Sequence, residues 1–137
     1  MEGATLNIWL ALDEVGPEQG ALRLYSRSHK LGNLGNLLNP EIWAGWASCL
    51  GDHCTLGDPV DLQPGDVTVH SQFTIHGTGE NGTSRPRWSW GALYVPGDGR
   101  YTGVQIPYTD GLGLKPFESL DHPDFPIIYD KDDHQAL

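Results

Sequence analysis

The fold is decided by one stretch of the sequence, His70-Ser-Gln-Phe-Thr-Ile-His76-Gly-Thr-Gly-Glu-Asn-Gly-Thr-Ser-Arg85-Pro-Arg87-Trp-Ser-Trp90. Its pattern predicts a short strand that ends in a histidine, a glycine-rich loop, and an arginine that opens a second strand. An imidazole is a common metal ligand, and a guanidinium can clamp a carboxylate with two hydrogen bonds. The stretch therefore predicts a pocket that receives His76 and Arg87 from neighbouring strands.

The strand that follows the loop, predicted over residues 88–95, has two different faces. Side chains alternate along a strand. The face of Arg87 then carries the small residues Ser89 and Gly91, and the opposite face carries Trp88, Trp90 and Tyr94. An arginine alone is as often half of a surface ion pair. The small neighbours favour a pocket, because they leave room for a ligand.

The composition narrows the class of protein. A chain of 137 residues predicts a single domain, residues 1–137, that builds a core without disulfides. The formal net charge of −10 argues against binding to nucleic acid or to anionic membranes, since both partners need a basic surface. No apolar run approaches the ~20 residues of a membrane span. No basic signal segment follows Met1, and Cys49 and Cys54 are interpreted as ordinary thiols, so we expect a cytoplasmic protein.

Short strands dominate the rest of the chain. The nearly continuous apolar run 6–13 predicts a strand that is covered on both faces. Further strands are predicted at residues 21–25, 60–62, 67–70 and 73–76. Many strands and little helix predict an all-β sandwich or barrel.

One helix and the C-terminal region complete the prediction. Asn39 followed by Pro40 is typical of a helix start, and we expect a short helix to about residue 48. The side chains expected to be buried from this helix are those of Ile42, Trp43 and Trp46. Residues 125–129 are expected to dock as an extended segment, and residues 130–137 to form a frayed acidic tail.

An ordered set of motifs in this chain resembles the phytanoyl-CoA dioxygenase family. The motifs are Asn7-Ile-Trp-Leu-Ala-Leu-Asp13, Gly20-Ala-Leu-Arg-Leu24, Ser26-Arg-Ser-His-Lys30, Pro64-Gly-Asp66, His76-Gly-Thr-Gly-Glu-Asn81 and Arg87. The resemblance extends from about Leu6 to Val95. It implies a double-stranded β-helix (jelly-roll, cupin-like) fold and an oxygenase that uses Fe(II) and 2-oxoglutarate to hydroxylate a small organic substrate.

The resemblance also implies roles for four residues. His76 matches the distal histidine of the family's iron-binding triad, and Arg87 matches the arginine that holds the distal carboxylate of 2-oxoglutarate. Thr78 lies where a hydroxyl residue contacts the cosubstrate, and Trp9 lies where an aromatic residue lines its pocket. Without the resemblance, core packing would be the preferred interpretation of Trp9.

The chain departs from the family pattern in one respect. The family's His-x-Asp, which supplies the other two iron ligands, does not precede Trp9. The only match by letters is His122-Pro-Asp124, at the opposite end of the chain. The resemblance therefore implies an incomplete jelly roll that lacks its first core strands and is inactive as this chain alone. Its open strand edges predict a homodimer that covers them.

Three alternatives to an oxygenase domain remain open at this point. The chain could be a non-catalytic remnant that binds a small anion through Arg87, or a cupin-like metalloprotein whose site is shared between subunits. A rearranged metal site could combine His70 and His76 with Asp52, with His53 or with a residue of a partner. The last is the weakest, because a histidine that closes a strand before a tight turn usually only hydrogen-bonds there.

Overall fold

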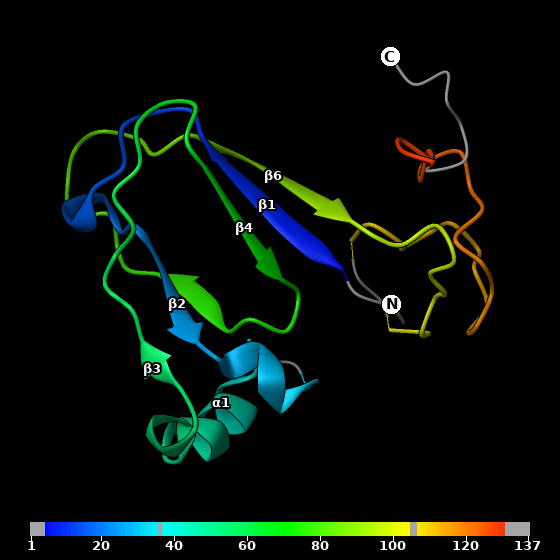
Figure 1. Ribbon diagram of the computed structural model, residues 1–137, viewed down its shortest axis with the longest axis horizontal. Coiled ribbons are helices and arrows are strands. Elements are labelled where there is room, and N and C mark those ends of the chain that lie inside the picture. The colour runs from blue at the N-terminus through cyan, green and yellow to red at the C-terminus, as the bar shows by residue number, and fades with distance from the viewer. Residues whose placement is uncertain (1–4, 36, 105–106, 131–137) are drawn as a thin grey trace. The chain divides into compact units, whose positions relative to one another are not determined.

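The computed structural model describes residues 5–35, 37–104 and 107–130 (Figure 1). The chain forms two compact units, Leu6–Tyr94 and a second one made of Met1–Thr5 with Val95–Leu137. All four predicted site residues belong to the first unit. The prediction of a single domain stays a prediction, and the predicted tail falls outside the described residues except for Asp130.

The first sheet contains three antiparallel strands in the order β4-β1-β6. They are β1 (Leu6–Ala11), β4 (Val67–Ser71) and β6 (Ser89–Tyr94), which lie side by side in Figure 1. The second sheet has the order β3-β2-β5. It is built from β2 (Leu22–Ser26), β3 (Thr55–Leu56) and β5 (His76–Thr78). Two antiparallel sheets and one short helix confirm the predicted all-β class.

The register of the first sheet separates two faces of different chemistry. Directly opposed residues in antiparallel strands share a face. The inner face is defined by Asn7, Trp9 and Ala11 of β1 with Thr68 and His70 of β4 and Ser89, Gly91 and Leu93 of β6. The outer face is defined by Leu6, Ile8 and Leu10 with Val67 and Val69 and with Trp90, Ala92 and Tyr94.

The outer face is largely apolar and, in the described part of the chain, partly open to solvent. Leu6 is 45% exposed, Val69 57% and Trp90 52%. The prediction that the strand at 6–13 is covered on both faces is therefore wrong at Leu6 and at Leu12, which is 50% exposed. A continuous apolar run shows that a strand avoids water, and it does not show what covers the strand.

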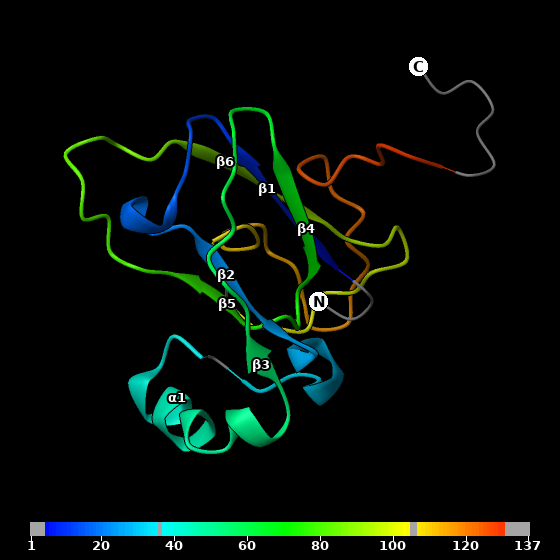
Figure 2. The same ribbon diagram turned by 60° about the vertical axis from the view of Figure 1, so that its left-hand side comes forward.

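The second sheet is covered on one side by the helical region. Helix α1 (Pro40–Ala47) begins at Asn39, whose side-chain oxygen accepts hydrogen bonds from the backbone N–H groups of Glu41 and Ile42. Figure 2 shows α1 beside this sheet. A core cluster of Leu50, Cys54 and Ile75 is packed by Tyr25, Leu31, Leu34, Leu37, Trp43 and Trp46. The helix start and the packing of both tryptophans are confirmed, whereas Ile42 is 36% exposed, so its predicted burial is wrong.

Two predicted strands differ from the structure. Residues 60–62 form no strand and contribute only the isolated bridge between Val15 and Leu62. Residues 73–74 belong to a turn, closed by a hydrogen bond from Thr74 N to Ser71 O (2.9 Å), and the strand begins at His76 instead of ending there. Both segments have the apolar pattern of a strand, but a strand forms only where the backbone pairs with a distant partner.

The motif Gln63-Pro-Gly-Asp66 forms the tight turn that leads into β4. Asp66 N donates to Gln63 O (2.9 Å), and Gly65 has φ 96°. A type II turn places proline second and requires a positive φ third, where glycine is strain-free. This turn directs Thr68 and His70 onto the inner face.

The second unit has a small core of its own. Tyr101 and Leu120 are buried, and Arg100 pairs with Ser119 in an isolated bridge. The prediction that residues 125–129 dock is wrong, since Ile127 is 75% exposed and Tyr129 76%. No helix among the described residues is long and apolar enough to cross a membrane.

Candidate functional site

His76 opens strand β5 with an exposed imidazole of defined orientation. Its Nδ1 lies 2.8 Å from the carbonyl oxygen of Thr74. A carbonyl can only accept, so Nδ1 carries a proton, and in the neutral imidazole the lone pair lies on Nε2. Metal-binding histidines are commonly oriented by such a bond to a backbone carbonyl. The imidazole of His76 is thus prepared to act as one metal ligand through Nε2.

A second imidazole lies against that of His76. His70 is the fourth residue of β4, and its ring centroid is 4.4 Å from the ring centroid of His76. Burial, and secondarily the neighbouring His76, lowers the pKa of His70 to about 4. His70 is therefore neutral at pH 7. The contact joins the inner face of the first sheet to the strand that carries His76.

Arg87 reaches the strand of His76 through Thr78. Its Nη2 is 3.5 Å from Thr78 Oγ1, and its Nη1 donates to the carbonyl oxygens of Gln19 (3.3 Å) and Gly20. Thr78 and His76 are two residues apart on β5 and so share one face. Thr78 thus connects Arg87 to the strand that carries His76, while the predicted roles of the three residues stay predictions.

The position of Arg87 depends on a close backbone approach at Gly20. Gly20 has φ 71°, and a Cβ there would overlap the carbonyl oxygen of Gly79 and lie 2.9 Å from that of Glu80. The approach is closed by a hydrogen bond from Gly82 N to Glu18 O (2.9 Å). Only glycine permits both the left-handed backbone and this contact. The glycine-rich loop after His76 is thereby held against the carbonyl groups that receive Arg87.

Trp9 lies on the inner face, between Thr68 and Gly91 in the register. It packs against the core cluster of Ala11, Val15, Ala21 and Leu62. This packing accounts for the residue as part of the core. A role in lining a cosubstrate pocket stays a prediction.

Ser28 supports the site, although the sequence assigns it no role beyond its place in a family motif. It is completely buried in the 3-10 helix η2 (Ser28–Leu31). Its hydroxyl donates to Tyr25 O (2.7 Å) and accepts from Ile75 N (2.8 Å). The bond to Ile75 anchors the residue that immediately precedes His76. The available signal was the Ser26-Arg-Ser-His-Lys30 motif, whose second serine has this structural role.

We expect Ser28→Ala to lower the free energy of unfolding by about 1–3 kcal/mol, because Ile75 N would be left buried without an acceptor. Urea denaturation measures the loss. Ser48→Ala is the matched control, since the Ser48 hydroxyl is exposed and donates to Gly45 O (3.1 Å) within the helical region. A surface change of this kind is expected to stay within about 0.5 kcal/mol. Equal effects of the two substitutions would contradict the assigned role of Ser28.

A complete iron site is not formed by the described residues. They contain no group of three His, Cys, Asp or Glu side chains that could hold a metal ion. For the same reason the rearranged site of His70 and His76 with Asp52 or His53 is not formed by these residues, whereas one completed by a partner stays a prediction. Asp52 ends the 3-10 helix η3 (Leu50–Asp52) and His53 follows it as its cap, and no such group joins them to His70 and His76. His122 and Asp124 pair with each other, with 3.7 Å between Nδ1 and Oδ2.

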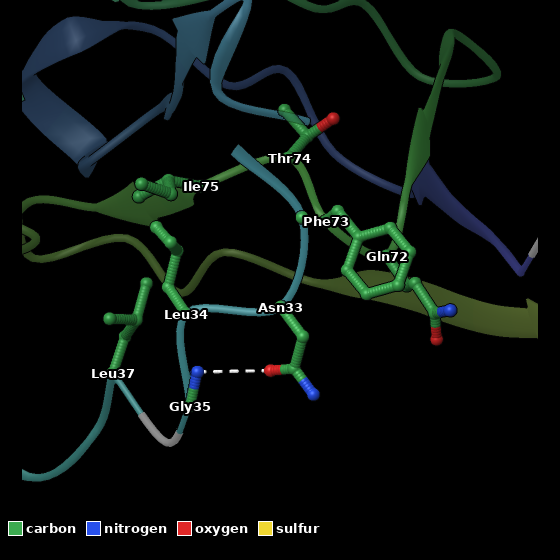
Figure 3. A pocket seen from close by; sticks show the side chains of 9 residues that line it. Asn33, Leu34, Gly35, Leu37, Gln72, Phe73, Thr74 and Ile75 are labelled. Carbon is green, nitrogen blue, oxygen red and sulfur yellow. Dashed lines mark hydrogen bonds between the residues drawn. The ribbon is translucent and has the colours of Figure 1, made fainter. Parts of the chain in front are cut away.

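A small pocket lies next to the turn that precedes His76 (Figure 3). Its volume is about 80 Å³, and its lining residues are 32–35, 37 and 72–75. Asn33 closes one side through a hydrogen bond from Gly35 N to its Oδ1 (2.9 Å). A pocket of this size holds a few atoms at most. It borders Thr74, the residue that orients His76, and does not include His76 itself.

Comparison with known proteins places these observations in a family. The phytanoyl-CoA dioxygenase (PhyH) family model matches residues 2–89, while no curated protein matches. Among solved structures, the α-ketoglutarate-dependent epimerase SnoN from nogalamycin biosynthesis is 29% identical over 90% of this chain and 47% of its own, with a TM-score of 0.63. The α-ketoglutarate-dependent carbocyclase SnoK is 26% identical over 89% of this chain and 47% of its own, with a TM-score of 0.68.

These neighbours define both the fold and the extent of the match. Together with the two antiparallel sheets of this chain, the likeness to these structures shows a partial jelly roll, as predicted. SnoN has been solved in complex with Fe³⁺, α-ketoglutarate and nogalamycin RO. The chain spans about half the length of the solved structures it matches. The family model covers most of the unit Leu6–Tyr94, which contains both sheets. The chain therefore belongs to the phytanoyl-CoA dioxygenase (PhyH) family, which uses Fe(II) and 2-oxoglutarate.

Proposed function

We propose that this chain contributes one side of the active site of an Fe(II)- and 2-oxoglutarate-dependent oxygenase that hydroxylates a small organic substrate in the cytoplasm. The observation that carries the proposal is the arrangement on β5, where His76 keeps Nε2 free and Thr78 contacts Arg87 (3.5 Å). Family membership supplies the reaction type. The free thiols of Cys49 and Cys54 support a reducing compartment.

Each of the four predicted residues has a distinct role in this proposal. His76 is an iron ligand through Nε2, and iron, when bound, supplies the activation of dioxygen. Arg87 holds the distal carboxylate of 2-oxoglutarate, for which its planar fork of donors is suited. Thr78 contacts the same cosubstrate through its hydroxyl, and Trp9 lines the cosubstrate pocket from the inner face.

The chain alone is proposed to be inactive, because one imidazole does not hold Fe(II). The absence of any three-ligand group among the described residues supports this. A facial triad of two histidines and a carboxylate is the usual iron site of such oxygenases. The two missing ligands are proposed to come from a His-x-Asp that this chain does not contain.

Anaerobic titration with Fe(II) and 2-oxoglutarate tests the proposal. The 137-residue chain is expected to give no metal-to-ligand charge-transfer absorbance. A longer polypeptide that supplies a His-x-Asp ahead of Leu6 is expected to give the band and to lose it in His76→Ala. A longer polypeptide without the band would overturn the assignment.

The same titration distinguishes the oxygenase from a non-catalytic remnant. The remnant is favoured by the lack of a three-ligand group among the described residues. A remnant that binds small anions through Arg87 would take up 2-oxoglutarate equally with and without metal. Strong dependence of the affinity on Fe(II) in the longer polypeptide would exclude that alternative.

We further propose that the chain forms a homodimer. In the described sheets β4 and β6 are edge strands of one sheet and β3 and β5 of the other. The outer face next to these edges exposes Val69 to 57% and Trp90 to 52%. Unpaired edges and apolar surface of this kind favour association.

Light scattering coupled to size exclusion is expected to show a dimer that Val69→Lys converts to a monomer, because burying an unpaired ammonium is costly. Val104→Lys is the matched control, since Val104 is a 62% exposed valine of the second unit. A wild-type chain that stays monomeric at about 100 μM would refute the dimer.

A further inference from the structure

Three buried polar atoms on β4 have no hydrogen-bond partner. They are Thr68 Oγ1 and both ring nitrogens, Nδ1 and Nε2, of His70. His70 is only 9% exposed. Buried polar groups in native proteins are almost always paired, and each exception calls for a missing partner such as water or a ligand. Both residues therefore call for a polar partner that the described side chains do not supply.

The unpaired atoms share one face and one neighbourhood. Thr68 and His70 are separated by one residue, so both side chains point to the inner face, roughly 7 Å apart along the strand. His70 also touches the ring of His76, at 4.4 Å between centroids. Beyond Thr68 the register continues through Trp9 to Gly91, which has no side chain and is exposed. His70 thus adjoins the proposed site through His76, and Thr68 follows it on the same face of β4.

The donors on β4 match one kind of ligand atom. An imidazole donates at least one N–H in either protonation state, and a threonine hydroxyl donates one O–H. Carboxylate and carbonyl oxygens are strong acceptors, and a carboxylate offers two of them, enough to meet both donors. Neither Thr68 nor His70 has an acceptor from the protein. The two oxygens of one carboxylate could therefore accept from both donors at once.

We propose that Thr68 and His70 form a binding contact for a carboxylate or carbonyl oxygen of the small molecule held between His76 and Arg87. This rests on the proposed function for the location of that molecule. The oxygen comes from the cosubstrate or from the substrate. Both sources share the same chemistry, and the two probes below distinguish them.

The first measurement uses thermal unfolding without ligand. Thr68→Val and His70→Phe preserve shape while removing the unpaired atoms. A buried polar group without a partner destabilises the fold when no ligand is bound. Each variant is therefore expected to melt about 3 °C or more above wild type. Val104→Thr, at a 62% exposed valine of the second unit, is the matched control and is expected to melt within about 1 °C of wild type. A clear drop in melting temperature for both variants would show that the groups are paired, by water for example, and would overturn the proposal.

The second measurement uses acetate and 2-oxoglutarate as probes, with the ring resonances of His70 and His76 followed by NMR. Acetate is expected to shift the His70 resonances in wild type and in Arg87→Ala, and Thr68→Val is expected to weaken this response by about 3-fold to 10-fold. If 2-oxoglutarate provides the oxygen, its affinity falls by a similar factor in Thr68→Val and His70→Phe. If only acetate responds to the Thr68 substitution, the oxygen belongs to the substrate.

The outcomes separate this inference from the proposed function. Binding of 2-oxoglutarate that depends on Arg87, with no response of His70 to acetate, would overturn the contact on β4 and leave the proposed function intact. A Thr68-dependent response to acetate, without any binding of 2-oxoglutarate by the longer polypeptide, would support the contact and count against the proposed cosubstrate.

Discussion

Arg87→Ala is expected to weaken the binding of 2-oxoglutarate by roughly 100-fold or more in the polypeptide that carries the complete site. Two charge-assisted hydrogen bonds from one guanidinium to a carboxylate contribute about 3 kcal/mol or more together. Arg87 already donates from Nη1 to Gln19 O (3.3 Å) and to Gly20 O, so its fork is oriented before the ligand arrives. Preorganisation of this kind lowers the entropic cost of binding. Calorimetric titration measures the loss.

Two further substitutions make the Arg87 result specific. Arg87→Lys keeps the charge and loses the planar fork, so an intermediate affinity is expected. Arg85→Ala is the matched control, since the Arg85 guanidinium donates to Gln19 Oε1 (3.3 Å) in the same loop. The Arg85→Ala substitution removes one positive charge and leaves the proposed clamp, Arg87, in place. If Arg85→Ala reduced the affinity as much as Arg87→Ala, the effect would be one of general charge and the clamp would be refuted.

Gly20→Ala is expected to destabilise the fold by about 3 kcal/mol or more, from backbone strain and steric overlap together. At φ 71° an alanine is strained, and its Cβ would overlap the carbonyl oxygen of Gly79. The loop after His76 would have to move away from Gly20, whose carbonyl oxygen receives the hydrogen bond from Arg87. Urea denaturation reports the destabilisation. Calorimetry on the remaining folded protein is expected to show weaker binding of 2-oxoglutarate.

Gly45→Ala provides the contrast for Gly20→Ala. Gly45 lies within α1, where a Cβ would meet nothing within 4 Å. Alanine there is expected to stabilise the chain by up to about 1 kcal/mol, because glycine is the poorer helix former. Substitutions of the same chemistry should therefore act with opposite signs. Destabilisation by both would mean that the loss at Gly20 does not come from its backbone conformation or its contact.

Features encoded by neighbouring residues could be predicted from the sequence. The helix start at Asn39 depends on hydrogen bonds that span two and three residues. The turn at Pro64 and Gly65 likewise depends on backbone preferences of the turn residues themselves. The ordered motifs also identified the family, and they singled out Thr78 and Arg87, whose side chains are in contact.

Features that depend on distant partners could not be predicted in this way. The bond from Ile75 N to Ser28 Oγ spans 47 residues, and the bond from Arg87 to Gly20 O spans 67. The contact between His70 and His76 requires that two different sheets face each other. The local turns, the helix start and the family of the chain thus follow from the sequence alone. The start of β5, the exposure of the outer face and the unpaired polar atoms on β4 emerge only in the folded chain. The reason is that strand pairing, burial and hydrogen bonding at these positions depend on residues far away in the sequence.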